Sequence, residues 1–167
     1  GNGWTQRAVE PEPVGAGEIP SELGGWPVTA IGYCAFVECS QMTAVTIPES
    51  VRELETYAFY GTDMYSVVIP AGVQRMGSNV FLWSNTRFVC FMGNAPEFVD
   101  PWTYDGTSDS LVTLVREGST GWSAPGSAAL PEQWPMVDEW NGAPRTIQTW
   151  TEFPEVPVQK WTVTFDL

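Results

Sequence analysis

A segment of about 22 residues occurs three times between residues 31 and 98, and this repetition constrains the fold more than any other feature. A phenylalanine recurs at intervals of 23 and 22 residues, at Phe36, Phe59 and Phe81. A fixed period of this size is typical of solenoids, in which each repeat buries its apolar face only against neighbouring repeats. We therefore expect a short, mainly β solenoid with parallel strands and short helical turns.

Each repeat contains one short segment with the alternating side-chain pattern of a β-strand, at residues 42–47, 64–69 and 86–91. Because successive side chains of a strand face opposite sides, one set points into the solenoid and the other points outward. The inward set is Val45, Ile47, Val67, Ile69, Val89 and Phe91, and the outward set is Ala44, Thr46, Ser66, Val68, Phe88 and Cys90. A proline is expected to end the strand in each of the first two copies. A second apolar pair, such as Val51 and Leu54, then forms the return leg, the segment that leads the chain back to the next repeat. The phenylalanines are expected to stack inside the solenoid as a ladder of rings.

This pattern resembles the BspA-like leucine-rich repeat of bacterial and treponemal proteins. The residues that carry the resemblance are Met42, Val45, Ile47-Pro48, Val51, Leu54 and Tyr57-Ala58-Phe59, with Ile31-Gly32 and Cys39 in the flanking copies. The third copy departs from the family, since Phe91-Met92 replaces Ile-Pro and Thr86 replaces the leading apolar residue. The resemblance implies a right-handed leucine-rich-repeat solenoid and a place on the surface of a bacterial cell.

The chain divides into four parts by composition and pattern. Residues 1–18 are an irregular lead-in, and residues 19–98 are the solenoid, with a degenerate first repeat before the three copies. Residues 99–144 form a tryptophan-rich, irregular β cap, in which Gly118-Ser119-Thr120-Gly121-Trp122 resembles the element that closes such arrays. Residues 145–167 are an extended linker and the start of another β module, whose strand 161–167 resembles the first strand of a Listeria–Bacteroides repeat.

Charge and composition exclude several classes of function. Twenty acidic residues face seven basic ones, giving a net charge of −13, which disfavours nucleic acids and anionic membranes because both reward a basic patch. The chain has no histidine, so neither a Ser-His-Asp triad nor a histidine metal site can form. We expect no enzymatic activity, no cofactor and no metal. No apolar run is long enough to span a bilayer.

Two groups of residues allow more than one interpretation. Asp100, Asp105 and Asp109 are favoured as a solvated loop with an Asp-Gly turn over a calcium site, because their spacing does not match an EF-hand loop. Cys34 and Cys39 flank a turn and either pair or serve as small packing residues, the second being preferred. Cys90 lies at an outward strand position, and we expect it to be partly exposed.

The outward strand positions are the predicted binding face, because solenoid sheets serve as recognition surfaces. The residues predicted to bind are Thr46, Ser66, Val68, Phe88 and Cys90 of this face, with Tyr65 and Arg87 nearby. The leading hypothesis is adhesion-type recognition of a protein or glycoprotein partner outside the cell by a monomer. One alternative is a structural spacer within a longer surface protein. Another is carbohydrate binding through Trp102 and Trp134 of the cap.

Two further points remain open in the sequence. Phe88 is a large apolar side chain at an outward position, so we expect another surface to shield it from solvent. That surface belongs either to a binding partner or to the C-terminal cap of the same chain. The chain begins Gly-Asn-Gly-Trp, with no signal peptide in the given sequence. We expect a mature or trimmed form of a secreted or cell-surface protein of a bacterium.

Overall fold

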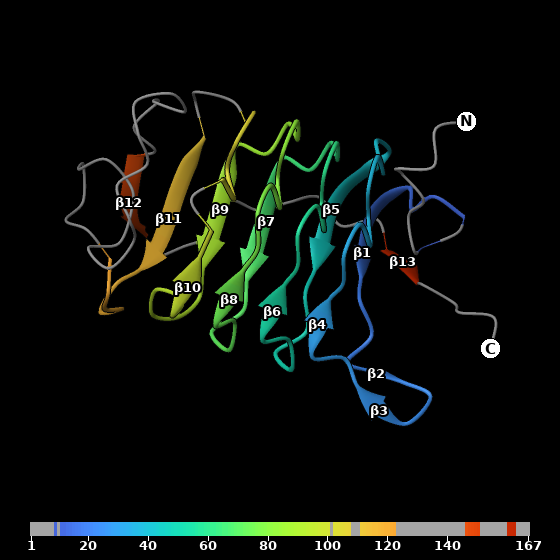
Figure 1. Cartoon of the computed structure of the whole chain (residues 1–167), viewed down its shortest axis with the longest axis horizontal. Coiled ribbons are helices and arrows are strands. Elements are labelled where there is room, and N and C mark those ends of the chain that lie inside the picture. The colour runs from blue at the N-terminus through green and yellow to red at the C-terminus, as the bar shows by residue number, and fades with distance from the viewer. Residues whose placement is uncertain are drawn as a thin grey trace.

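Parallel strands stacked repeat upon repeat make up the fold (Figure 1). The structure, a computed structural model, describes residue 9, residues 11–100, 102–107 and 111–122, and the backbone of residues 146–150 and 160–162. The part of the chain that it describes contains strands and turns and no helix. The expected mainly β solenoid of parallel strands is confirmed.

The strands form two parallel sheets and one small hairpin. The seven-stranded main sheet has the order β12-β11-β9-β7-β5-β1-β13. Its strands are β1 (Gly15–Glu18), β5 (Met42–Thr46), β7 (Ser66–Ile69), β9 (Phe88–Phe91), β11 (Val112–Arg116), β12 (Thr146–Trp150) and β13 (Lys160–Thr162). The return legs make a four-stranded sheet of β4 (Ala30–Ile31), β6 (Glu53–Leu54), β8 (Arg75–Met76) and β10 (Phe98–Val99). An antiparallel hairpin of β2 (Glu22–Leu23) and β3 (Trp26–Pro27) projects near the N-terminal end (Figure 1).

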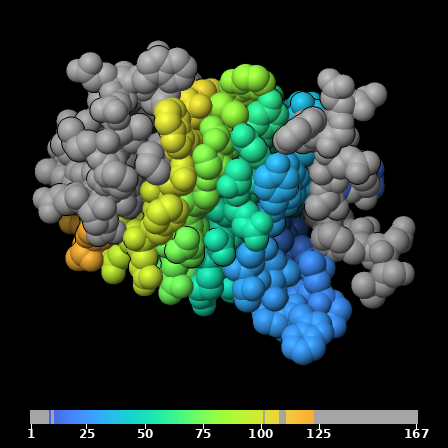
Figure 2. Space-filling model, in the orientation of Figure 1, coloured from blue at the N-terminus to red at the C-terminus, as the bar shows by residue number. Residues whose placement is uncertain are grey.

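The register of the main sheet follows the repeat of the sequence. Thr46 pairs with Val68, Val68 with Cys90, and Cys90 with Leu114, so equivalent residues of successive repeats lie side by side. Figure 2 shows the same order as adjoining bands of colour. Each repeat therefore contacts mainly its two neighbours, as a solenoid requires.

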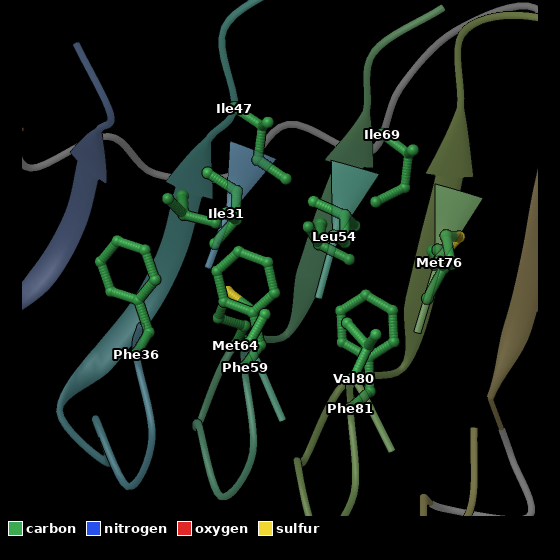
Figure 3. Packing of buried hydrophobic residues seen from close by; sticks show 14 of the residues in the cluster. Ile31, Phe36, Ile47, Leu54, Phe59, Met64, Ile69, Met76, Val80 and Phe81 are labelled. Atoms are coloured by element: carbon green, nitrogen blue, oxygen red, sulfur yellow. The ribbon is translucent and has the colours of Figure 1, made fainter. Parts of the chain in front are cut away.

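Stacked aromatic rings fill the core (Figure 3). The Phe36 and Phe59 ring centroids are 5.4 Å apart, and those of Phe59 and Phe81 are 6.0 Å apart, with interplanar angles of 12° and 6°. Tyr104 continues the ladder at 5.9 Å from Phe81. Rows of aliphatic residues, such as Ile31, Leu54 and Met76, are buried beside the rings. The predicted phenylalanine ladder is confirmed and has a fourth rung.

The turns that carry these rings are not helical, contrary to the expectation. They span residues 33–38, 56–61, 78–83 and 102–106. Cys34, Tyr57 and Asn79 occupy equivalent places in the first three turns and have φ values of 55°, 60° and 55°. A right-handed helix cannot continue through residues in the left-handed region, so the chain forms stacked turns instead.

The solenoid extends beyond the predicted boundaries at both ends. Residues 15–18, expected to be part of an irregular lead-in, form β1 and pair in parallel with β5. In the region expected to be an irregular cap, β10, Tyr104 and β11 build one more turn of the solenoid. Residues 146–150, expected to be linker, pair with β11, while Lys160–Thr162 pairs with β1 at the opposite end of the sheet.

Candidate functional site

The outer face of the main sheet consists of the strand side chains that alternate with those of the core. Exposure along this face changes from one repeat to the next. Thr46 is exposed and Val68 is half-buried, whereas Cys90 and Leu114, in the same row, are only 1% and 7% exposed. Both faces of the sheet are thus buried around Cys90 and Leu114, while the outer face is open at Thr46.

The burial of Cys90 corrects the expectation that it is partly exposed. It lies between Val68 and Leu114 on the outer face, and burial raises the pKa of its thiol to about 12. A thiol with such a pKa stays protonated and unreactive at neutral pH. Strand alternation assigned Cys90 to the correct face, but alternation carries no information about whether that face is covered.

Three of the predicted face residues meet at the start of β7 and β9. The rings of Tyr65 and Phe88 make an edge-to-face contact with centroids 5.5 Å apart, and the Arg87 guanidinium lies 5.8 Å from the Phe88 centroid. The Tyr65 carbonyl accepts hydrogen bonds from the backbone N–H groups of Arg87 and Phe88, at 2.9 and 3.2 Å. Tyr65 is 53% exposed, Arg87 is exposed and Phe88 is half-buried. We call Tyr65, Arg87 and Phe88 the sheet-face patch.

The remaining predicted face residues contribute less surface. Ser66 is 5% exposed and pairs with Phe88, so its side chain offers little to a partner. Thr46 and Val68 pair with each other two residues further along the strands than Ser66 and Phe88, where Thr46 is exposed and Val68 half-buried. The patch is therefore smaller than the sequence predicted, and it is displaced toward the strand starts.

The alternative residues of the sequence analysis lie elsewhere. Trp102 is 41% exposed in the fourth turn, where its backbone N–H donates to Asp100 Oδ1 at 2.9 Å. Trp134 and Asp109 lie outside the described residues. Asp105 Oδ2 accepts a hydrogen bond of 3.5 Å from Asn79 Nδ2. The described residues contain no group of three or more His, Cys, Asp or Glu side chains that could hold a metal ion.

Cys34, Cys39 and Cys90 form no disulfide within the described residues. Cys34 and Cys39 are buried, at 4% and 0% exposure. This agrees with the preferred interpretation of the pair as small packing residues.

The sequence analysis missed a second exposed aromatic cluster, which lies on the turns. Tyr33 contacts Tyr57, Tyr57 contacts Tyr60, and Tyr60 contacts Trp83, with ring centroids 6.0, 5.7 and 5.4 Å apart. Tyr33 and Trp83 are 55% and 68% exposed. These residues flank the repeated buried phenylalanines, so examining the polar side of each turn for aromatic residues would have found them.

Comparison with known proteins agrees with this architecture. Residues 23–99 match the model of the family described as BspA type Leucine rich repeat region (6 copies). No curated protein matches the chain. Within the described residues, no helix is long and apolar enough to cross a membrane.

Two solved structures are similar to this chain. One is a leucine-rich repeat protein of T. pallidum, 20% identical, with a TM-score of 0.44 over 67% of this chain and 68% of that one. The other is a leucine-rich cell surface protein of Faecalibacterium prausnitzii, 20% identical, with a TM-score of 0.40 over 66% of this chain and 40% of that one. The repeat register, the two parallel sheets and the aromatic ladder described above all agree with the family match: residues 23–99 of this chain match the BspA type leucine rich repeat in sequence and fold as a solenoid of parallel strands.

Proposed function

We propose that this chain is a recognition domain of a bacterial secreted or cell-surface protein. It binds a protein or glycoprotein partner through the sheet-face patch of Tyr65, Arg87 and Phe88. Repeat solenoids present extended sheet surfaces that serve in binding, and tyrosine and arginine are enriched among the residues that dominate binding energy. The location at the cell surface rests on the family resemblance.

The observation that carries the proposal is the preassembled contact between the three side chains. The Tyr65 ring and the Arg87 guanidinium both contact the half-buried Phe88 ring, so the two exposed groups of the patch are already oriented in the free protein. Ordering side chains on binding costs free energy, and a preformed cluster avoids part of that cost. A spacer would gain nothing from an exposed tyrosine and an exposed arginine arranged around a half-buried phenylalanine.

The test is binding of the purified chain to an array of matrix glycoproteins and glycans. The variant Tyr65→Ala/Phe88→Ala removes both rings, and Arg87→Glu reverses the charge without removing buried surface. Trp26→Ala is the matched control, because Trp26 is 78% exposed on the β2–β3 hairpin and outside the patch. Thermal melts check that each variant is folded.

The proposal predicts a saturable signal that Arg87→Glu and the double variant each weaken at least about tenfold, while Trp26→Ala leaves it unchanged. A glycan signal that survives both patch variants would contradict the proposal and favour a carbohydrate site elsewhere. The absence of any signal would contradict it as well and favour the spacer.

A further inference from the structure

The four aromatic side chains on the turns form one continuous surface. We call Tyr33, Tyr57, Tyr60 and Trp83 the aromatic ridge. It crosses three consecutive turns, and its two outermost rings, Tyr33 and Trp83, are more than half exposed. The turns lie below the rings of Phe36, Phe59 and Phe81 in Figure 3, on a different side of the solenoid from the main sheet.

Backbone hydrogen bonds between turns hold the ridge in place. The N–H groups of Phe36 and Phe59 donate to the carbonyls of Ala58 and Val80, at 2.9 and 3.0 Å. Gly61 N–H likewise donates to the Leu82 carbonyl at 2.9 Å. Because every turn is bonded to the next, the exposed rings sit on a rigid support and lose little freedom on binding.

Trp83 occupies a turn position at which the backbone is left-handed in all four of the described turns. Its φ is 55°, in the left-handed region that a bulky residue rarely adopts. Gly61 and Gly106 occupy the equivalent places in the turns on either side, with φ values of 66° and 60°, and Glu38 occupies it in the first turn, with a φ of 54°. Residues held in such conformations cluster at ligand-binding sites. Glycine adopts this φ without strain, so the backbone conformation does not explain why residue 83 is a tryptophan. The exposed indole ring therefore suggests a role in binding.

The surroundings of the ridge are acidic. Glu55 accepts a hydrogen bond from Tyr33 N–H at 2.8 Å, and Glu38 N–H bonds to the Tyr60 carbonyl at 2.7 Å, so both glutamates lie among the rings. The four arginines whose side chains the structure describes belong to other surfaces. Arg52 and Arg75 lie in or beside the return legs, and Arg87 and Arg116 in or beside the main sheet.

From this combination we infer that the aromatic ridge is a second binding site, and that its ligand is an extended, basic segment of a partner protein. Arginine and lysine side chains bind over tyrosine and tryptophan rings and pair with flanking carboxylates. Successive rings are steeply inclined, at 73°, 89° and 47°, so they form notches rather than the flat platform on which a sugar chain stacks. A polyproline-type segment rises about 3.1 Å per residue, so alternate residues recur at about the spacing of the rings.

The inference can be tested separately from the proposed function, because the two sites share no residue. The probe is a fluorescently labelled synthetic peptide of alternating arginine and proline, and its anisotropy is measured on titration with the whole chain. Trp83→Gly removes the ring and places at residue 83 the amino acid found at the equivalent place of the two neighbouring turns, so we expect this variant to fold. Tyr65→Ala/Phe88→Ala is the control on the sheet face.

The expected result is saturable binding that Trp83→Gly weakens at least about tenfold and the sheet-face control leaves unchanged. Glu38→Gln should weaken binding further, added salt should do the same, and a peptide with glutamine in place of arginine should bind more weakly. Equal binding to wild type and Trp83→Gly would overturn the inference. It would also be overturned if a chito-oligosaccharide bound in a Trp83-dependent way and the peptide did not.

Discussion

Thr86 occupies a core position where the other repeats have methionine, and its replacement tests the energetics of the core directly. Met42 and Met64 hold the equivalent places, and all three side chains are 0% exposed. The Thr86 hydroxyl has no hydrogen-bond partner in the part of the chain that the structure describes. A buried unpaired polar group costs about 1–3 kcal/mol. Valine is close in shape to threonine, so Thr86→Val should raise the free energy of unfolding by about 1–2 kcal/mol.

A second threonine provides the matched control. Thr62 is 2% exposed, but its hydroxyl donates to the Phe59 carbonyl at 3.0 Å. Thr62→Val removes this bond and should therefore lower the free energy of unfolding by about 1–2 kcal/mol. Urea unfolding followed by circular dichroism measures both changes, and thermal melts should shift by roughly 2–4 °C per kcal/mol in opposite directions. If Thr86→Val destabilises the protein as much as Thr62→Val does, the reasoning about the unpaired hydroxyl is wrong.

Three further predictions concern the ladder, the turns and the buried thiol. Phe59→Ala removes a ring stacked on both sides and should cost about 3–5 kcal/mol in urea unfolding; a loss below about 1.5 kcal/mol would contradict the ladder as the centre of the core. Gly77→Ala should cost about 1–3 kcal/mol, because a Cβ there would lie 2.7 Å from the backbone nitrogen of Thr56, whereas Gly32→Ala, with nothing within 4 Å, should change the stability little. Equal effects of the two glycine variants would refute this. Burial raises the pKa of Cys90 to about 12, from 9.0. The unfolded thiol therefore ionises first, so stability is fully retained below about pH 9 and lost as the pH rises toward 12. Cys90→Ala should make unfolding less sensitive to alkaline pH, and an unchanged pH dependence would count against a protonated native thiol.

The sequence repeat predicted the core well because its constant length aligns equivalent residues of successive repeats. Phe36, Phe59 and Phe81 had to stack once each turn was placed on the next, and the alternating strands had to align in parallel. The ladder nevertheless continues to Tyr104, which follows Phe81 by 23 residues. Reading the motif as alanine followed by phenylalanine hid this rung. What the stack requires is a flat ring next to a small residue, and Thr103-Tyr104 satisfies that requirement.

The candidate surfaces were harder to predict, for two physical reasons. Alternation along a strand tells which side a residue such as Cys90 faces, but its burial depends on atoms far away in the sequence. The aromatic ridge was not predicted because a periodic sequence pattern identifies buried positions, where packing selects apolar side chains. Exposed positions such as Tyr33 and Trp83 are free of that selection, so no period marks them.

The pairing of β13 with β1 has a consequence for how the solenoid unfolds. A linear array of repeats can fray from either end, since each unit depends only on its neighbours. Here Lys160–Thr162, from the end of the sequence, covers the edge of the strand that begins the array. The first repeat cannot detach without releasing the last strand, so the two ends of the chain protect one another. A solenoid capped in this way should fray less readily from its first repeat than an array without such a strand.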